Sequence, residues 1–394
     1  MPSPSPAVIG LTAMELLTIL LGFLLSAGLT ALIIPRIILI SYKKRLFDAT
    51  GGRKVHTGAV PRLGGVAFTP SVIITVALLA GLEAAVSPGG SFAGRGDVSL
   101  ALCLSAITML YLEGVADDLV GVGYKAKFGM QLLSASIVAA SGIWMNDLHG
   151  LFSLEALSPW AGYPLTVLLL VFVINAVNLI DGIDGLASGL SSLALFFLGC
   201  LFAARGETLW AVLSFTTLGT LVPFFCYNVF GRPGGGRKIF MGDCGSQTVG
   251  LLLGLLCVRF CMEAPGASAS PPGQNPLAVV FSLLMVPCLD VLRVMMGRMR
   301  RGKNPFLPDK THIHHKFLAL GMSHRTALVV ILSIAAFFAL LNLGLLPLLD
   351  INFVLLADIL LWTAMNIWLS RLIRARQARG EGQEDIQAEE TNTK

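Results

Sequence analysis

The sequence predicts an all-α polytopic membrane protein with about eleven transmembrane helices. Of its 394 residues, 55% are apolar and only 13% are charged, and the mean hydropathy is +0.78. Apolar runs recur along the chain, each long enough to cross about 30 Å of hydrocarbon as a helix. The predicted spans are 11–34, 64–82, 98–116, 129–145, 160–180, 186–204, 208–229, 244–262, 276–297, 325–346 and 353–370.

The distribution of Lys and Arg predicts the orientation of these spans. An odd number of spans puts the two termini on opposite sides of the membrane. With the N-terminus outside, 25 of the 28 Lys and Arg residues lie inside, and only Arg95, Arg205 and Arg259 lie outside. We therefore expect an inner (plasma) membrane protein with a cytoplasmic C-terminus.

The chain is predicted to hold a single transmembrane domain, residues 1–370, followed by a cytoplasmic tail, residues 371–394. The tail begins basic and then becomes polar and acidic, a composition typical of disorder. The seven cysteines lie almost all within spans or at their ends, without a CxxC pair. We therefore expect neither disulfides nor a thiolate metal site.

Acidic residues form four clusters at or near the ends of apolar runs, all on the predicted cytoplasmic side. They are Asp117-Asp118, Asp181 with Asp184, Asp243, and Asp309. Ionisable groups are costly in a bilayer, so such positions mark candidate functional sites. Their common side indicates one site at the inner membrane surface.

Asp117 and Asp118 end the third predicted span, and Lys125, Lys127 and Gln131 follow. Adjacent carboxylates repel each other, so a cation is needed beside them, either a metal ion or a lysine. The alternative is a solvated helix end with ordinary interfacial charges.

The densest polar motif is Asn175-Ala-Val-Asn178-Leu-Ile-Asp181-Gly-Ile-Asp184-Gly. Its Asn175, Asn178 and Asp181 recur every three residues and so lie near one helix face. A tight Asp-Gly turn is the structural alternative, but it does not explain two amides in the preceding turns. CDP-alcohol phosphotransferases also use an acidic, DG-rich helix. Their pattern continues with Ala-Arg and two further spaced aspartates, which are absent after Leu186.

Asp243 lies in Phe240-Met-Gly-Asp-Cys-Gly-Ser246, which opens the eighth predicted span. The carboxylate suits a hard cation such as Mg²⁺, and a helix N-terminus favours phosphate. Arg237 and Lys238 add positive charge, and Phe240 is a candidate for stacking on a base. The alternative is an N-cap beside an interfacial aromatic residue.

Two basic segments complete the set. One holds Asp290, Arg293, Arg298, Arg300, Arg301, Asp309, His312, His314 and His315, and the other holds Gly52-Arg53-Lys54-Val-His56 and Pro61-Arg62-Leu-Gly64-Gly65. Some of the arginines serve only topology or lipid headgroups. The histidines could form a zinc site, but the other clusters are oxygen ligands that suit Mg²⁺ or Mn²⁺. Phosphate binding by His and Arg is therefore favoured.

Taken in order from about Arg53 to Gly321, these motifs resemble those of the polyprenyl-phosphate N-acetylhexosamine-1-phosphate transferases. The matching segments are RKVH…PRLGG, DD…KxK…Q, NAVNLIDGIDGLA, FMGDCGS and D…GRMRRGKNPFLPDKTHIHH. The resemblance implies a bundle of ten or eleven transmembrane helices with its active site on the inner face. HIHH after PFxPD resembles the undecaprenyl-phosphate α-N-acetylglucosaminyl 1-phosphate transferase branch, which starts O-antigen, enterobacterial common antigen and teichoic acid linkage units.

The reaction that the resemblance implies joins GlcNAc-1-phosphate from UDP-GlcNAc to undecaprenyl phosphate, with release of UMP. Mg²⁺ is the implied cofactor, with Mn²⁺ as the alternative. Another UDP-N-acetylhexosamine, or phospho-MurNAc-pentapeptide, is the alternative donor chemistry. A transporter is a more distant alternative, which would hold carboxylates near the bilayer midplane. We expect no nucleic-acid partner, and a homodimer is left open.

The resemblance also implies roles for individual residues. Asp243 and Asn178 would bind the metal, and Asp117 and Asp118 would lie at the lipid phosphate, one of them a candidate base. Asn175, Asn178, Asp181 and Asp184 would shape the nucleotide-sugar site, with Phe240 near uracil. The residues implied to contact phosphates or GlcNAc, with Arg298 and His314 counted as catalytic, are Lys125, Arg298, Arg300, Arg301, His312, His314 and His315. Glu113 departs from the family pattern, which usually has a small or apolar residue there.

Overall fold

The computed structural model describes residues 11–46, 60–86, 97–232, 236–262, 275–302 and 311–392. Regular structure in these ranges is helical, apart from an isolated antiparallel bridge between Asp147 and Ala156. The chain divides into two compact units, residues 1–270 and 271–394, where the sequence predicted one transmembrane domain over residues 1–370.

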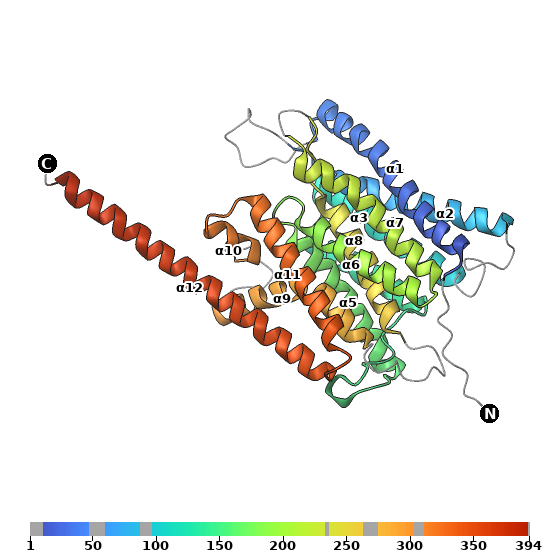
Figure 1. Ribbon diagram of the computed structural model, residues 1–394. Coiled ribbons are helices and arrows are strands. Elements are labelled where there is room, and N and C mark those ends of the chain that lie inside the picture. The colour runs from blue at the N-terminus through green and yellow to red at the C-terminus, as the bar shows by residue number, and fades with distance from the viewer. Residues whose placement is uncertain are drawn as a thin grey trace. The chain divides into compact units, whose positions relative to one another are not determined.

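The first unit contains eight α-helices and two short 3₁₀ helices within its described residues (Figure 1). They are α1 (Ala13–Lys44), η1 (Gly64–Ala67), α2 (Phe68–Val86), α3 (Asp97–Val120), α4 (Tyr124–Ala140), η2 (Leu151–Ser153), α5 (Pro159–Ile180), α6 (Leu186–Ala204), α7 (Thr208–Phe230) and α8 (Gly242–Cys261). The second unit contains α9 (Pro276–Arg300), α10 (Ile313–Ala319), α11 (His324–Leu345) and α12 (Ile351–Asn392).

Ten helices in the described part of the chain are long and apolar enough to cross a membrane, and the protein is therefore a multi-pass membrane protein. The predicted span 129–145 accounts for the difference from eleven. It corresponds to α4, which has 17 residues and lies at the lower limit of length for a spanning helix. The side on which each terminus lies depends on whether α4 crosses, so the predicted orientation stays a prediction.

Helix α8 lies at the centre of the first unit. It packs against α3, α5, α6 and α7, and nearly all of its residues are buried. Small residues allow this close packing. A Cβ added to Gly250 would lie 2.8 Å from the Cα of Ile174 in α5, and one added to Gly245 would lie 2.8 Å from the Cα of Gly65. The N-terminus of α8, which carries Asp243, is thereby held inside the bundle.

In the second unit, α9 packs against α11 and α12, and α10 contacts the same two helices. A buried polar cluster joins the three long helices, because the Asn342 amide donates to Ser282 Oγ (2.6 Å) and to Asp358 Oδ2 (2.5 Å). Helix α12 continues to Asn392 and so includes most of the tail predicted to be disordered. The Arg, Gln, Glu and Ala residues there are good helix formers and can extend a helix begun by the apolar residues before them.

Candidate active site

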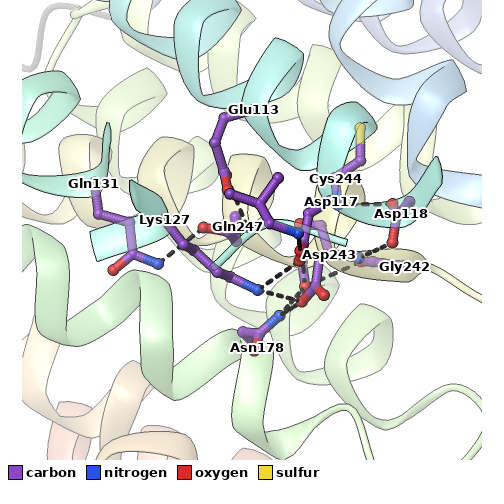
Figure 2. A network of polar contacts seen from close by, with 12 residues as sticks. Glu113, Asp117, Asp118, Lys127, Gln131, Asn178, Gly242, Asp243, Cys244 and Gln247 are labelled. Carbon is purple, nitrogen blue, oxygen red and sulfur yellow. Dashed lines mark hydrogen bonds and ion pairs between the residues drawn. The ribbon is translucent and has the colours of Figure 1, made fainter. Parts of the chain in front are cut away.

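The candidate active site lies where the C-terminal ends of α3 and α5 meet the N-terminal ends of α4, α6 and α8. Figure 2 shows its central contacts, in which side chains of α3, α4 and α5 converge on Asp243 at the start of α8. These elements are far apart in the sequence, and the packing around α8 brings them together.

Asp118 caps the N-terminus of α8. Its two carboxylate oxygens accept hydrogen bonds from the backbone N–H groups of Asp243 (2.8 Å) and Cys244 (3.0 Å). A carboxylate is a favourable partner for the first N–H groups of a helix, which have no acceptor within the helix. Both oxygens are thus occupied in holding Asp243 in place, where the sequence predicted a place for Asp118 at the lipid phosphate.

The backbone just before Asp243 requires glycine. Gly242 has a φ of 74°, in the left-handed region that favours glycine. A Cβ at this position would also lie 2.0 Å from the carbonyl oxygen of Arg62 and 2.5 Å from Asp118 Oδ2. The glycine in the Phe240–Ser246 motif is therefore explained by a tight approach of three chain segments.

Lys127 links the carboxylates of Asp117 and Asp243. Its Nζ lies 3.0 Å from Asp117 Oδ2 and 3.0 Å from Asp243 Oδ1, and Asp117 Oδ1 accepts from the Val122 N–H at 2.7 Å. Burial of the ammonium group acts to lower its pKa, but Asp243 and Asp117 outweigh it and hold the pKa of Lys127 above its ordinary value. The lysine is therefore charged at neutral pH, and it is the cation that the adjacent acids require.

Asn178 connects α5 to the start of α8. Its Nδ2 donates to Asp243 Oδ1 and to Ser246 Oγ, the latter at 2.7 Å. Asn175 lies one turn earlier on α5 and donates to Gln131 Oε1 at 2.7 Å and to the carbonyl oxygen of Val171 at 2.8 Å. The two amides thus meet different neighbours although they share a helix face.

The turn from α5 to α6 carries Asp181 and Asp184. Gly185, with a φ of 81°, precedes α6, and its N–H donates to Asn228 Oδ1 at 2.6 Å. Asn228 in turn donates to the carbonyl oxygen of Ile239 at 2.8 Å, and Lys238 forms an ion pair with Asp184. A single buried amide at the end of α7 therefore ties this turn to the segment that leads into α8.

The carboxyl of Asp181, in the same turn, has a shifted pKa. Its side chain reaches water, yet the density of surrounding protein atoms desolvates the carboxylate. This desolvation, with repulsion from Asp184 and Asp243, raises the pKa of Asp181 to about 7, although Arg62 opposes the shift. A carboxyl of this kind accepts a cation readily, because the cation relieves both penalties.

The segment before α8 pairs with the chain before η1. The Phe240 N–H donates to the Pro61 carbonyl oxygen (2.8 Å), and the Gly64 N–H donates to the Phe240 carbonyl oxygen (2.9 Å). Lys238 Nζ lies 5.9 Å from the centroid of the half-buried Phe240 ring. This pairing explains why Pro61–Gly65 and Phe240–Ser246, about 180 residues apart in the sequence, belong to one site.

The second unit contains a separate buried cluster around Asp290 on α9, which is fully buried. Asp290 accepts from His312 Nδ1 (2.8 Å), from the Ile313 N–H (3.1 Å) and from Arg293 (2.6 Å). These bonds fix the start of α10. Both ring nitrogens of the buried His314 have no hydrogen-bond partner in the described ranges, so this ring has two nitrogens that a ligand could contact.

His314 is neutral at pH 7. Burial, and repulsion from His315, lower the pKa of His314 to about 4, against the attraction of Asp290. Its ring packs on His315, with the two centroids 4.2 Å apart. Arg298 is buried near the end of α9, whereas Arg300 and Arg301 are exposed. These residues are described within the second unit, so their predicted meeting with the aspartates of the first unit stays a prediction.

The sequence of this chain matches proteins of one known family. Residues 100–261, which run from α3 through α8, match the model of glycosyl transferase family 4. The chain is 31% identical over 348 residues to the decaprenyl-phosphate N-acetylglucosaminephosphotransferase of Mycobacterium leprae. The aligned residues cover 82% of this chain and 80% of that relative. The chain belongs to glycosyl transferase family 4.

Two further relatives support this membership. This transferase is 30% identical over 327 residues to the probable undecaprenyl-phosphate N-acetylglucosaminyl 1-phosphate transferase of Bacillus subtilis, over 83% of this chain and 84% of the relative. It is 28% identical over 310 residues to the undecaprenyl-phosphate α-N-acetylglucosaminyl 1-phosphate transferase of Yersinia pestis, over 77% of this chain and 78% of the relative. The protein is therefore a glycosyl-1-phosphate transferase, and the predicted family is confirmed.

The carboxylate and amide oxygens of the site are the kind of ligand that a hard cation such as Mg²⁺ prefers. Among the described residues, no group of three or more His, Cys, Asp or Glu side chains is arranged as a metal site. The Lys127 ammonium instead stands between Asp117 and Asp243, where a divalent cation would compete for the same carboxylates. Asn178 turns its amide nitrogen to Asp243, so ligation by its carbonyl oxygen requires the amide to rotate.

Of the Lys125-Ala-Lys127 segment, the sequence predicted Lys125 as the site residue. Lys125 is exposed, whereas Lys127 reaches the carboxylates. Gln131 belongs to the DD…KxK…Q motif but was not predicted as a site residue. Gln247 and Asn228 were not predicted either, and the signal available for them was only their position at the predicted inner end of an apolar run. Arg53, His56 and Asp309 lie outside the described residues.

Proposed function

We propose that this transferase moves GlcNAc-1-phosphate from UDP-GlcNAc to a polyprenyl phosphate, giving GlcNAc-diphospho-polyprenol and UMP. The observation that carries this proposal is the cluster of Asp117, Lys127 and Asp243 at the ends of membrane helices. The relatives named above support the choice of sugar and lipid. Undecaprenyl phosphate is our proposed acceptor, and decaprenyl phosphate is the alternative that one relative's name suggests.

The chemistry explains why acids and bases meet at a membrane surface. An oxygen of the lipid phosphate attacks the phosphorus that carries GlcNAc, a new P–O bond forms, and the bond to UMP breaks. One diphosphate replaces another, so little bond energy changes. The catalytic demand is to bring an anion toward a dianion in the correct orientation, which positive charge and fixed geometry accomplish.

The site residues of the first unit have the following proposed roles in this reaction. Asp243 and Asp117 would hold Mg²⁺, which when bound neutralises phosphate charge. Lys127 holds these carboxylates in the unliganded protein and is free to turn to a phosphate once a metal replaces it. Asp118 acts through its cap on α8. Asn175, Asn178, Asp181, Asp184 and Phe240 face the nucleotide sugar.

The second unit is proposed to supply phosphate contacts from Arg298, Arg300, Arg301 and the three histidines. Neutral His314 suits hydrogen bonding to GlcNAc or to a phosphate better than ion pairing. We also propose that the protein lies in the plasma membrane with this site on the cytoplasmic face, supported by the excess of Lys and Arg in the predicted inner loops. A homodimer stays open.

Release of UMP by the purified protein tests the proposal. We expect UMP only when undecaprenyl phosphate, Mg²⁺ and UDP-GlcNAc are all present, and none after treatment with EDTA. No UMP with any UDP-sugar would contradict the transferase reaction. Release with UDP-GalNAc but not with UDP-GlcNAc would contradict only the sugar.

The Asp243→Asn variant tests the site itself. The amide keeps the size of the side chain but removes the charge that binds a cation, so we expect turnover to fall by about 100-fold or more. An unchanged thermal midpoint in detergent is the control for folding. Normal turnover would refute the metal role of Asp243.

A further inference from the structure

Four polar side chains form a continuous hydrogen-bonded chain from the candidate active site to α3. Asn175 Nδ2 donates to Gln131 Oε1 at 2.7 Å, and Gln131 Nε2 donates to Gln247 Oε1 at 2.8 Å. Gln247 Nε2 then donates to Glu113 Oε2 at 3.2 Å. The residues come from α5, α4, α8 and α3 in turn, and Figure 2 shows the part that runs from Gln131 to Glu113. We call these four residues the amide chain.

Three members of the amide chain are buried. The exposed fractions of Gln131, Gln247 and Glu113 are 1%, 0% and 8%. A buried polar group keeps its protein partners because solvent offers no replacement. Each amide in the chain is therefore held in one orientation by its two neighbours.

Glu113 sets the direction of the amide chain. Its Oε2 accepts from Gln247, and its other oxygen, Oε1, has no hydrogen-bond partner in the described part of the chain. Gln247 turns its NH₂ toward Glu113 and its oxygen toward Gln131, which is the orientation that an ionised carboxylate, able only to accept, requires. The same constraint passes to Gln131 and then to Asn175, since each amide oxygen receives the next NH₂.

The consequence appears at Asn175, where the amide chain reaches the site. Both hydrogens of its Nδ2 are used, one by Gln131 Oε1 and one by the carbonyl oxygen of Val171 at 2.8 Å. Among the described residues none donates to Asn175 Oδ1. Asn175 is only half-buried and precedes Asn178, which contacts Asp243, by one helical turn. Its carbonyl oxygen is thus the atom that remains for a ligand.

We propose that Glu113 is a positioning residue of the transferase, which orients Asn175 through Gln247 and Gln131. With Glu113 as the terminal acceptor, Asn175 presents its carbonyl oxygen to an N–H or O–H group of the nucleotide sugar. Without it, the amides are free to turn over, and Asn175 can present its NH₂ instead. This inference rests on the proposed function, because it assigns the oxygen to that substrate.

Steady-state kinetics with a matched series of variants test the proposal. Glu113→Leu removes the acceptor, and we expect KM for UDP-GlcNAc to rise by about tenfold, the effect of one lost hydrogen bond, with a much smaller change in kcat. Glu113→Gln keeps an acceptor oxygen but adds an NH₂ that can donate, so it no longer imposes one direction on the amide chain, and KM should rise by less than in Glu113→Leu. Ser134→Ala, a buried polar position on the same helix as Gln131, is the control and should leave KM unchanged.

Two outcomes overturn the proposal. If Gln131→Met leaves KM unchanged while Glu113→Leu raises it, Glu113 does not act through the amide chain. If Glu113→Leu leaves KM unchanged while the wild type releases UMP, the positioning role is wrong and the transferase function stands. Absence of UMP release by the wild type contradicts the proposed function itself. Should Glu113→Leu fail to fold, Gln131→Met interrupts the amide chain in its middle and must raise KM to the same extent.

A double-mutant cycle separates positioning from general stability. In an Asn175→Ala background the carbonyl oxygen is already gone, so Glu113→Leu should raise KM by less than about twofold further. Multiplicative effects of the two changes would mean that Glu113 acts elsewhere. Direct titration with UDP-GlcNAc in the absence of the lipid provides the same comparison as a dissociation constant, without turnover.

Discussion

Lys127 is the residue that joins two of the acidic clusters of this transferase, those of Asp117 and Asp243. It stands between Asp117 and Asp243, 3.0 Å from each, whereas Lys125 is exposed two residues earlier. Residues two apart on a helix point to different sides. Lys125 and Lys127 both lie close to Asp117 in the sequence, so sequence position did not indicate which lysine contacts the carboxylates.

The two lysines form a natural pair for mutagenesis. We expect Lys127→Met to lower kcat/KM for UMP release by about 100-fold, because the positive charge that turns to a phosphate when a metal binds is lost. Lys125→Met should cause a much smaller loss. Equal losses in the two variants would favour the role that the sequence predicted for Lys125.

Asp181 predicts a dependence of stability on pH. Its pKa is raised from 3.8 to about 7, so between these values the folded protein holds a proton that the unfolded chain has released. This carboxyl therefore makes the protein less stable as pH rises toward 7. In EDTA, Asp181→Asn should raise the thermal midpoint more at about pH 8 than at about pH 5. The same gain at both pH values would contradict the raised pKa.

At the scale of elements, the N-terminus of α8 is defined by contacts that are distant in sequence. Asp118 caps it, Gly242 allows the Arg62 segment to approach, and Gly245 packs on Gly65. An apolar run and an acidic first turn predicted where this helix starts, to within two residues. It could not show that the acid performing the cap lies 125 residues earlier.

Gly242→Ala tests this junction. The left-handed backbone alone costs about 1–3 kcal/mol for a residue with a side chain, and the new Cβ also meets the Arg62 carbonyl oxygen. We expect a lower thermal midpoint and loss of turnover, because Asp243 moves with the helix start. Gly123→Ala is the control, since a Cβ there meets no atom within 4 Å. A Gly242→Ala variant as stable and as active as Gly123→Ala would contradict the tight approach.

At the scale of the whole molecule, the topology depends on α4. If this 17-residue helix crosses the membrane, the active site and residues 141–158 lie on opposite sides. In a variant without its accessible native cysteines, Tyr124→Cys should react with an impermeant maleimide only from the cytoplasmic side, and Glu155→Cys only from outside. Labelling of both from the same side would show that α4 does not cross and would remove the eleventh span.

The sequence by itself determined the class of fold and the family, and it predicts the side of the membrane on which the chemistry takes place. These follow from local properties: apolar runs long enough to span a bilayer, the bias of Lys and Arg, and motifs in a fixed order. Hydrophobic length acts within one segment, so it can be read without knowing any neighbour.

Only the tertiary structure decided which side chains meet. Lys127 rather than Lys125 on the carboxylates, Asp118 as a cap, Asn228 between two loops, and the amide chain from Asn175 to Glu113 all join helices far apart in the sequence. Each depends on how the helices rotate and pack around α8. Because a rotation of one helix by a single residue turns its side chains by about 100°, partners of this kind are fixed by packing and not by local sequence.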